Sequence, residues 1–403
     1  MDKKFPPAVI VGLNDASMSL VRSLGRRGIQ IIGLYDDTCH EYYVKSKYYS
    51  KILRSPLYDR SLVDSLIQNV AGNLKESAVL FCTNDNSVLT VSKYAEQLKP
   101  FFQFVLPAYE VTSDQISKKK FYNFALKNSF LVPKTLFIDD CEEVEKTAEI
   151  ISFPCIIKPE FRNKSWSEKV PVKVLYAESK ESFANLIKTY QIQNISLVVQ
   201  EWIEGGDCKV YFCLAYIDRN HQPLAVCVAK KLRQYPHLTG STSVAETVNI
   251  PQISAEAMRL LNAAKCVGFC SVEFKQSMIN GRFYVTEPTI GRPDTQEGIC
   301  ISAGVDIPWV AYLDAIGGDV PPLLNFRKGV KWINEPLEFY SFQEYVRTRR
   351  NLREFISVYK GIRSYAMWAW DDPIPFLTFI KEKVEKGISR ILGARRVGWR
   401  DSK

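Results

Sequence analysis

A lysine at the end of an apolar segment is a first candidate for chemistry. The segment Phe153–Pro159 reads FPCIIKP, and Pro159 favours an extended backbone at Lys158, so the lysine side chain should project from a strand. An ammonium group in that position can bind phosphate oxygens as a compact positive charge. Taken alone, the segment is also typical of a strand-end lysine whose alkyl stem covers apolar surface.

Two glutamates lie on segments that the sequence predicts to pair. Cys270–Lys275 and Arg282–Pro288 alternate as strands do, and the Asn-Gly at 280–281 is a strong signal for a tight hairpin turn between them. Pairing about that turn would set Glu273 and Glu287 on one face. Two converging carboxylates suit Mg²⁺, which takes hard oxygen ligands from one or two carboxylates and from a nucleotide. The simpler alternative is a hairpin with two solvent-facing glutamates.

A third segment joins an apolar strand to an acidic turn. Leu197–Asp207 reads LVVQEWIEGGD, so the polar residues begin where the apolar run ends. Backbone groups in such a hinge can pair with the edge of an adenine, and a carboxylate shortly afterwards can accept hydrogen bonds from ribose hydroxyls. By itself this is an ordinary strand followed by a turn.

The N-terminal part of the chain alternates strand and helix signals. Apolar runs at Ala8–Leu13, Ile29–Tyr35 and Ala78–Cys82 are separated by helical segments, the first with a plausible N-cap at Asn14. Such alternation predicts a doubly wound domain with a parallel sheet. The turn after the first run contains only Gly12 instead of the three glycines of a dinucleotide fingerprint, which argues against NAD or FAD binding.

Composition and charge indicate whether the protein binds nucleic acid. The chain has 403 residues, 46% of them hydrophobic, and a net charge of +9. Residues 325–403 carry 17 Lys/Arg and 9 Asp/Glu, so +8 of the excess lies in this aromatic-rich end and the remainder is nearly neutral. A nucleic-acid-binding enzyme would carry basic residues around its core domain as well. We therefore predict no nucleic-acid partner.

The sequence also bears on location and on cysteine use. No run approaches 18 apolar residues, and the N-terminus lacks the pattern of a signal peptide. We expect a cytoplasmic protein. The ten cysteines form no CxxC pair and only three histidines are present, which predicts free core thiols and no structural zinc site.

In their order along the chain, these segments resemble the ATP-grasp superfamily, and most of all its carboxylate–amine ligases of the D-aspartate-ligase-like kind. The likeness extends over about 111–318. It includes the basic stretch and Gly/Ser/Thr loop of Ala229–Ser243 and the segment Ala303–Pro308. The resemblance implies an α/β and α+β protein with three parts. These are a Rossmann-like pre-ATP-grasp domain (1–110), a two-subdomain ATP-grasp domain (111–324) and a basic helical C-terminal extension (325–403).

The resemblance assigns roles to individual residues, and it implies ATP and Mg²⁺ as the nucleotide and the metal. Lys118 and Lys158 would contact the phosphates. The other assignments place the adenine hinge at Gln200, Glu201 and Ile203, the ribose carboxylate at Asp207 with Glu204 as a competitor, the metal ligands at Glu273, Glu287 and Thr289, and the catalytic cations at Arg292, Lys231 and Arg233.

One departure from the family pattern matters for the metal. Family members usually carry Glu-x-Asn-Pro-Arg at the second metal strand, whereas this chain has Thr289 at the Asn position and Arg292 shifted by one residue. Thr289 or Asp294 would have to replace the usual ligand, and Gly291 would have to let the arginine approach. An ATP-binding protein without turnover, acting as a regulator or scaffold, is therefore the main alternative, and a dehydrogenase is the minor one.

The reaction that the resemblance implies joins a small-molecule carboxylate to an amine through an acyl phosphate. The substrates would be an amino acid, or an amino-sugar or cell-surface precursor. For the extension we predict helices at 342–359 and 376–392. Its aromatics and basic residues either pack on the body or form a surface for a membrane or partner protein, in which case the protein would lie at the inner face of the membrane. The sequence leaves the oligomeric state open.

Overall fold

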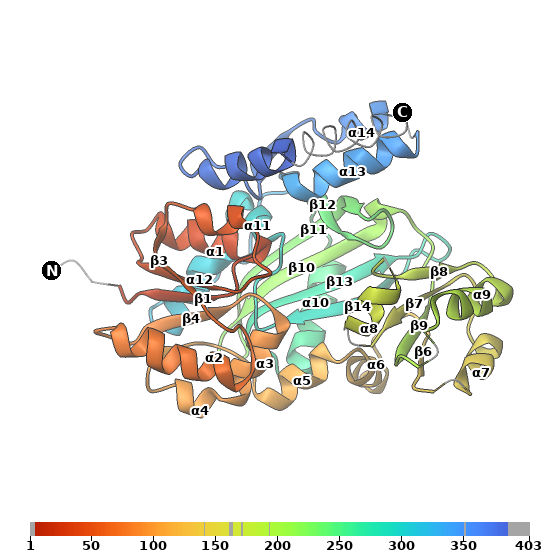
Figure 1. The fold of residues 1–403 in the computed structure, drawn as a ribbon, viewed down its shortest axis with the longest axis horizontal. Coiled ribbons are helices and arrows are strands. Elements are labelled where there is room, and N and C mark those ends of the chain that lie inside the picture. Colours follow the sequence, from red (N-terminus) through yellow and green to blue (C-terminus); the bar gives the residue numbers. More distant parts are fainter. Residues whose placement is uncertain are drawn as a thin grey trace, which may run out of the picture.

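The computed structural model describes residues 5–140, 142–160, 164–170, 172–192, 194–349 and 352–385. In these residues the long strands form three sheets, of five, four and seven strands. Figure 1 shows the five-stranded sheet on one side of the seven-stranded sheet and the four-stranded sheet on the other, with the C-terminal helices forming a layer along the top. The predicted mixture of α/β and α+β architecture is thus confirmed in outline.

The N-terminal sheet is parallel and has the order β3-β2-β1-β4-β5, as the strand–helix alternation predicted. Alternate residues of β1 pack on opposite faces, Ile10 against α1 and Val9 against α2 and α3. The elements of this region are β1 (Ala8–Val11), α1 (Asp15–Gly25), β2 (Ile31–Tyr35), β3 (Tyr49–Arg54), α2 (Asp59–Ser65), β4 (Ala78–Cys82), α3 (Asp85–Lys93), α4 (Ala95–Leu98), β5 (Phe102–Gln103), α5 (Tyr109–Ile116) and α6 (Lys118–Lys127).

The four-stranded sheet is antiparallel and has the order β6-β9-β7-β8. Along β7, Cys155 and Ile157 are buried in an apolar cluster with the helices, whereas Ile156 and Lys158 alternate to the opposite face. This period of two sets the direction of the lysine. The elements are β6 (Thr135–Ile138), α7 (Glu143–Ile150), β7 (Cys155–Pro159), α8 (Lys164–Lys169), β8 (Leu175–Ala177), α9 (Lys180–Tyr190) and β9 (Leu197–Glu201).

The seven-stranded sheet has the order β14-β13-β10-β11-β12-β15-β16 and is antiparallel except for the pair β15–β16. Apolar clusters cover both of its faces, one with α10 and the other with α12 and the N-terminal sheet. The elements are β10 (Val210–Ile217), β11 (Pro223–Tyr235), β12 (Ser241–Thr247), α10 (Pro251–Ala263), β13 (Gly268–Gln276), β14 (Phe283–Ile290), α11 (Glu297–Ala303), α12 (Ile307–Ala315), β15 (Lys331–Ile333) and β16 (Ile362–Tyr365).

The C-terminal extension is not purely helical, because β15 and β16 extend the large sheet. Around them lie α13 (Glu335–Arg347), α14 (Leu352–Ser357) and a helix over 374–385. The helix predicted at 342–359 is therefore divided between α13 and α14, since α13 ends at Arg347. The part of the second predicted helix beyond 385 lies outside the described residues.

The extension packs on the body through buried ion pairs. The Nε of Arg22 on α1 lies 3.1 Å from Asp372 Oδ2, and both side chains are nearly inaccessible. Phe379 is 1% exposed and packs edge-on against Tyr42 of the N-terminal region. The sequence left open whether the extension packs on the body or forms a surface for a membrane or a partner protein. Asp372 and Phe379 pack on the body. Among the described residues, no helix is both long enough and apolar enough to cross a bilayer.

Candidate active site

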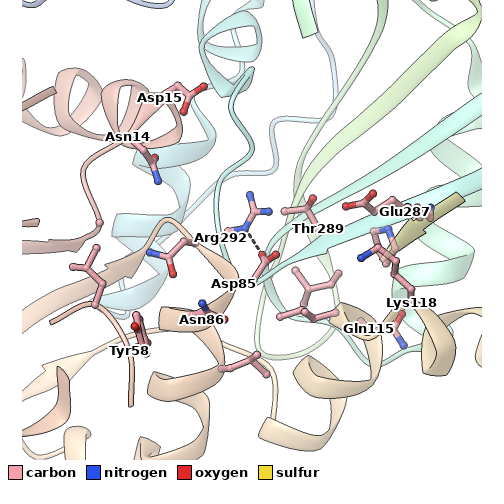
Figure 2. A pocket seen from close by; sticks show the side chains of 18 of the residues that line it. Asn14, Asp15, Tyr58, Asp85, Asn86, Gln115, Lys118, Glu287, Thr289 and Arg292 are labelled. Carbon is pink, nitrogen blue, oxygen red and sulfur yellow. Dashed lines mark hydrogen bonds and ion pairs between the residues drawn. The ribbon is translucent and has the colours of Figure 1, made fainter. Parts of the chain in front are cut away.

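Two adjoining cavities lie where the three sheets meet. The larger has a volume of about 900 Å³ and extends from the four-stranded sheet to the loops of the N-terminal sheet. The smaller, of about 470 Å³, lies between β7, β9 and the strands of the large sheet. Figure 2 shows Asp85 and Arg292 between the N-terminal loops and the group formed by Thr289, Glu287 and Lys118. The residues that line both cavities include Asp85, Lys118, Lys158, Gln200, Glu287, Thr289 and Arg292.

The two predicted phosphate-binding lysines both reach this junction. Lys118 begins α6, where Ser117 caps the helix, and its Nζ donates to the carbonyl of Glu160 at 2.7 Å. Lys158 extends from β7, and its Nζ lies 3.4 Å from Gln200 Oε1. Burial lowers the pKa of both ammonium groups, that of Lys158 to about 8. The negative charge of Glu287 raises the pKa of both lysines, but by less than burial lowers it. Glu287 is therefore not a full counter-charge for the two lysines, and both favour an anionic ligand.

The predicted hairpin places the two glutamates opposite each other. In the register of β13 and β14, Glu273 pairs with Glu287 across the strands, so both carboxylates project on one face. Burial raises the pKa of Glu287, but the charges of Lys173, Lys158 and Lys118 outweigh that effect and leave the pKa below its usual value. Glu287 is therefore a carboxylate at neutral pH.

An arginine from the strand end completes the junction. Arg292 Nε lies 2.5 Å from Asp85 Oδ1, which belongs to the first turn of α3 in the N-terminal region. Gly291 has φ +77°, and a Cβ there would lie 2.5 Å from Val88 Cγ1, so the close approach of the strand end to α3 requires glycine. The shift of the arginine by one residue is accommodated in this way.

The predicted adenine hinge borders the smaller cavity. Gln200, Glu201 and Ile203 all line it. The N–H of Glu201 donates to the carbonyl of Lys134, and the Gln200 side-chain amide donates to Thr135 Oγ1 at 2.9 Å. These contacts tie β9, an inner strand of the four-stranded sheet, to β6 and the residue before it.

The predicted ribose ligands lie elsewhere. Asp207 is buried and accepts hydrogen bonds from the backbone N–H and side-chain amide of Gln234 and from the N–H of Leu238. These contacts fix the loop between β11 and β12, and neither Asp207 nor Glu204 lines either cavity. Asp207 holds a loop through its engaged oxygens and Glu204 is exposed. The ribose role of the two residues stays a prediction.

Lys231 and Arg233 lie two residues apart on β11 but have different surroundings. Lys231 Nζ lies 2.8 Å from Glu273 Oε2 and lines the smaller cavity. Arg233 is 3% exposed, pairs with Glu338 of α13 and donates to the carbonyl of Phe355. The register of β11 against β12 shifts between the two residues, a bulge that aims them apart. The observed contacts of Arg233 anchor the extension, and its catalytic role stays a prediction.

Several residues at the junction were not foreseen. Lys173 lines the smaller cavity, and Lys275 lies there with its Nζ 2.6 Å from the carbonyl of Gly205. Asp85 follows the third apolar run of the sequence, and its place at the carboxyl end of a parallel strand is the signal that would have found it. Tyr340 and Asn334 of the extension line the larger cavity, which no local motif indicates.

The donor set fits a divalent cation that is shared with phosphates. Glu273, Glu287 and Thr289 supply hard oxygen atoms around one cavity, which suits Mg²⁺. Among the described residues, no cluster of three or more His, Cys, Asp or Glu side chains could hold a metal ion by itself. The remaining ligands would have to be phosphate oxygens and water, and Asp294, which also lines this cavity, is available at its edge.

Comparisons with known proteins agree with this architecture. No protein-family model matches the chain. The D-aspartate ligase of Enterococcus faecium (strain Aus0004) is 21% identical over 247 residues, which cover 58% of this chain and 58% of that protein, less than two thirds of its length. Among solved structures, the N5-carboxyaminoimidazole synthetase of Staphylococcus aureus complexed with ADP has a TM-score of 0.62 at 15% identity and covers 81% of this chain and 82% of its own. An L-amino acid ligase from Bacillus licheniformis has a TM-score of 0.60 at 14% identity, with 79% of this chain and 78% of its own covered.

Proposed function

From the ATP-grasp fold of this chain, we propose that it is an ATP-dependent ligase that joins a carboxylate to an amine and releases ADP and phosphate. One observation supports the proposal most strongly. Lys118, Lys158 and the pair Glu287 and Arg292 come from three separate segments and line the junction of two cavities. Cations and a carboxylate that converge in this way suit phosphoryl transfer, where catalysis consists mainly of positioning and charge stabilisation.

The smaller cavity is the proposed nucleotide site. The adenine would lie along the hinge at Gln200, Glu201 and Ile203, with the phosphates directed toward Lys158 and Lys118. Glu273, Glu287 and Thr289 would hold Mg²⁺, whose charge helps to neutralise the phosphates when it is bound. Lys231 holds Glu273 through its ion pair and so fixes the direction of that carboxylate.

The proposed reaction has two steps. A carboxylate oxygen of the first substrate attacks the γ-phosphorus of ATP, the bond from that phosphorus to the bridging oxygen breaks, and ADP leaves. The amine nitrogen then attacks the acyl carbon, phosphate departs with the bond electrons, and the amine loses a proton to give the amide. Arg292 and Lys231 are the proposed donors to the charge that develops on the reacting oxygens.

The larger cavity is the proposed site of the substrates. It shares Lys118, Lys158 and Arg292 with the nucleotide site, whereas its far end presents Asp15 and Asp36. A positive end suits the carboxylate that becomes phosphorylated, and a negative end suits a protonated amine elsewhere on the substrate. The volume of about 900 Å³ exceeds what a free amino acid fills, which supports an amino-sugar or cell-surface precursor as one substrate. In this proposal, parts 1–110 and 111–324 form the walls, and 325–403 closes one side.

Calorimetric titration with a non-hydrolysable ATP analogue and Mg²⁺ tests the nucleotide site. We expect Lys158→Ala to weaken binding on the order of 100-fold, because it removes a charge-assisted contact in a shielded site. Lys146→Ala, on the exposed side of α7 and outside both cavities, is the matched control and should bind as the wild type does. Absence of binding by folded wild-type protein would leave the proposal without its main support.

The second candidate function is an ATP-binding protein without turnover. Two observations favour it: Thr289 replaces a usual metal ligand, and Glu273 is already paired with Lys231. Phosphate release in the presence of candidate amines and carboxylates separates the two functions. Release that Glu287→Gln abolishes identifies the ligase, whereas tight binding without release under all substrate mixtures identifies the binder.

A further inference from the structure

The helix over 374–385 has a second apolar face that is about half exposed. Phe379 is buried against the body, so one side of the helix is accounted for. On the other side, four aliphatic side chains between 40% and 53% exposed recur at helical spacing: Ile374, Leu377, Ile380 and Val384. An amphipathic helix of a globular protein normally presents charged residues on its outer side, so this pattern calls for a binding partner.

The two preceding helices show the same feature. Phe342 and Val346 on α13, and Leu352 and Ile356 on α14, are 45% to 61% exposed. Ten of the 22 large hydrophobic side chains that are exposed among the described residues lie between 342 and 384, a small part of the chain. We call the exposed side of these three helices the outer C-terminal face; in Figure 1 the helices form the blue layer at the top, outside the sheets.

Positive charge accompanies this apolar surface. On or directly after these helices lie the exposed basic residues Arg347, Arg349, Arg353, Lys360 and Lys381, against the exposed acidic residues Glu354 and Glu385. Residues 325–403 carry 17 basic and 9 acidic residues in all. The sequence from 386 to 403, beyond the described residues, adds six basic residues and one acidic residue.

We propose that the outer C-terminal face docks on an anionic lipid surface. Aliphatic side chains of helices that lie flat enter the boundary between headgroups and acyl chains, while Lys and Arg meet the lipid phosphates. A second copy of this chain fits less well, because a two-fold contact would bring two extensions of charge +8 together. These residues line neither of the two cavities of the candidate active site, so the surface is separate from it.

Docking of this kind would bring the larger cavity near the lipid. Helix α13 carries Phe342 and Val346 on its exposed side, whereas Leu337 and Tyr340 of the same helix line the cavity. One helix therefore connects the two surfaces. The inference does not depend on the proposed ligase activity, because lipid binding is measured without turnover.

Vesicle co-sedimentation of the full chain tests the proposal. We expect binding to vesicles of phosphatidylcholine with phosphatidylglycerol, weaker binding to phosphatidylcholine alone, and a decrease as salt rises. The double variant Leu377→Ser/Ile380→Ser should bind at least about fivefold more weakly, since it removes two inserting side chains. Arg347→Glu/Arg349→Glu should lose the preference for anionic lipid. Ile150→Ser, an equally exposed aliphatic residue on α7, should bind as the wild type does.

Three results would overturn the proposal. The first is failure of the wild-type protein to sediment with anionic vesicles at low salt. The second is equal binding by Leu377→Ser/Ile380→Ser and Ile150→Ser, which would place the contact elsewhere. The third is a concentration-dependent dimer in sedimentation velocity that the same double variant dissociates, because the face would then serve a second copy. Nucleotide binding by each variant, measured in parallel, shows that the fold is intact.

Discussion

The candidate active site and the seam between the body and the C-terminal extension both contain buried cations, but the partners of these cations differ. In the seam, Arg22 donates to Asp372 and to the carbonyls of Ala366 and Met367, so its buried charge is fully engaged. In the candidate active site, the contact of Lys158 within the described part of the chain is a long one, 3.4 Å from Nζ to the neutral amide oxygen Gln200 Oε1. Burial without full pairing raises the free energy of the charged lysine, whereas the arginine is stabilised by its partners.

This difference separates a site that binds a ligand from one that holds the fold together. A fully paired cation has little to gain from a further anion, while an incompletely paired one in a cavity gains much. Lys231 and Arg233 on the same strand are both paired, with Glu273 and Glu338 respectively, but only the lysine lines a cavity. The residue type alone does not show whether a buried cation binds a ligand or holds the fold together. The groups that it contacts do show this.

The largest effect on stability should come from breaking the seam. We expect Arg22→Ala to lower the free energy of unfolding by about 3–5 kcal/mol, because it leaves Asp372 buried without its counter-charge. Urea denaturation measures the loss. Arg26→Ala breaks the neighbouring, more exposed pair with Asp371 and should cost only about 1 kcal/mol or less. If the two variants lost equal free energies of unfolding, burial of the Arg22–Asp372 pair would not be what makes it stabilising.

A smaller effect is expected at the ion pair that joins the N-terminal region to the cleft. Asp85 orients Arg292, so Asp85→Asn should lower kcat by about tenfold with little change in the KM for ATP. Steady-state kinetics of ATP consumption provide the measurement. A rise in KM with unchanged kcat would indicate that Asp85 acts in binding instead of in positioning.

Nucleotide affinity should depend on pH through Lys158. The pKa of its ammonium group, lowered to about 8 by burial, means that the free protein loses this charge as pH rises through 8. Since phosphates favour the protonated form, we expect affinity for the ATP analogue to fall severalfold from pH 7 to pH 9. Lys158→Arg keeps its charge over this range and should flatten the profile. A wild-type profile that is flat up to pH 9 would contradict this assignment.

The smallest effect concerns a buried carboxyl next to the cleft. Burial, with the charge of Asp294, raises the pKa of Glu297 to about 8. Its stabilising contribution is therefore full at low pH and is lost as pH rises through 8, where the buried group must ionise. Glu297→Gln should raise the melting temperature by roughly 1–2 °C at pH 8.5 and leave it unchanged at pH 5. Thermal unfolding at the two pH values checks this, and equal shifts at both would exclude a titration effect.

The local features of the site could be predicted because they depend on short-range rules. The Asn-Gly signal predicts the hairpin of β13 and β14, and a shift of register at Thr286 then brings Glu273 opposite Glu287. The alternation of β7 directs Lys158 away from the helices, and the strand–helix alternation predicts the parallel N-terminal sheet. Each of these inferences uses residues within one or two adjacent segments.

Partners that are far apart in the sequence could not be predicted from local patterns. Asp207 carries the right group for a ribose ligand, but contacts with Gln234 and Leu238 across the loop engage its oxygens. Arg233 has the right charge for catalysis, yet a bulge turns it toward Glu338, 105 residues away. The strands β15 and β16 are only three and four residues long and were missed, because pairing with the large sheet is what makes them strands.

The sequence by itself determined the types of elements, the hairpin and the cations and carboxylates available to a nucleotide, because periodicity and turn chemistry act over a few residues. Only the tertiary structure shows which of those charged side chains line a cavity with few partners and which form ion pairs that hold the extension to the body. This difference depends on contacts between segments hundreds of residues apart, such as Arg22 with Asp372, and no local pattern encodes them.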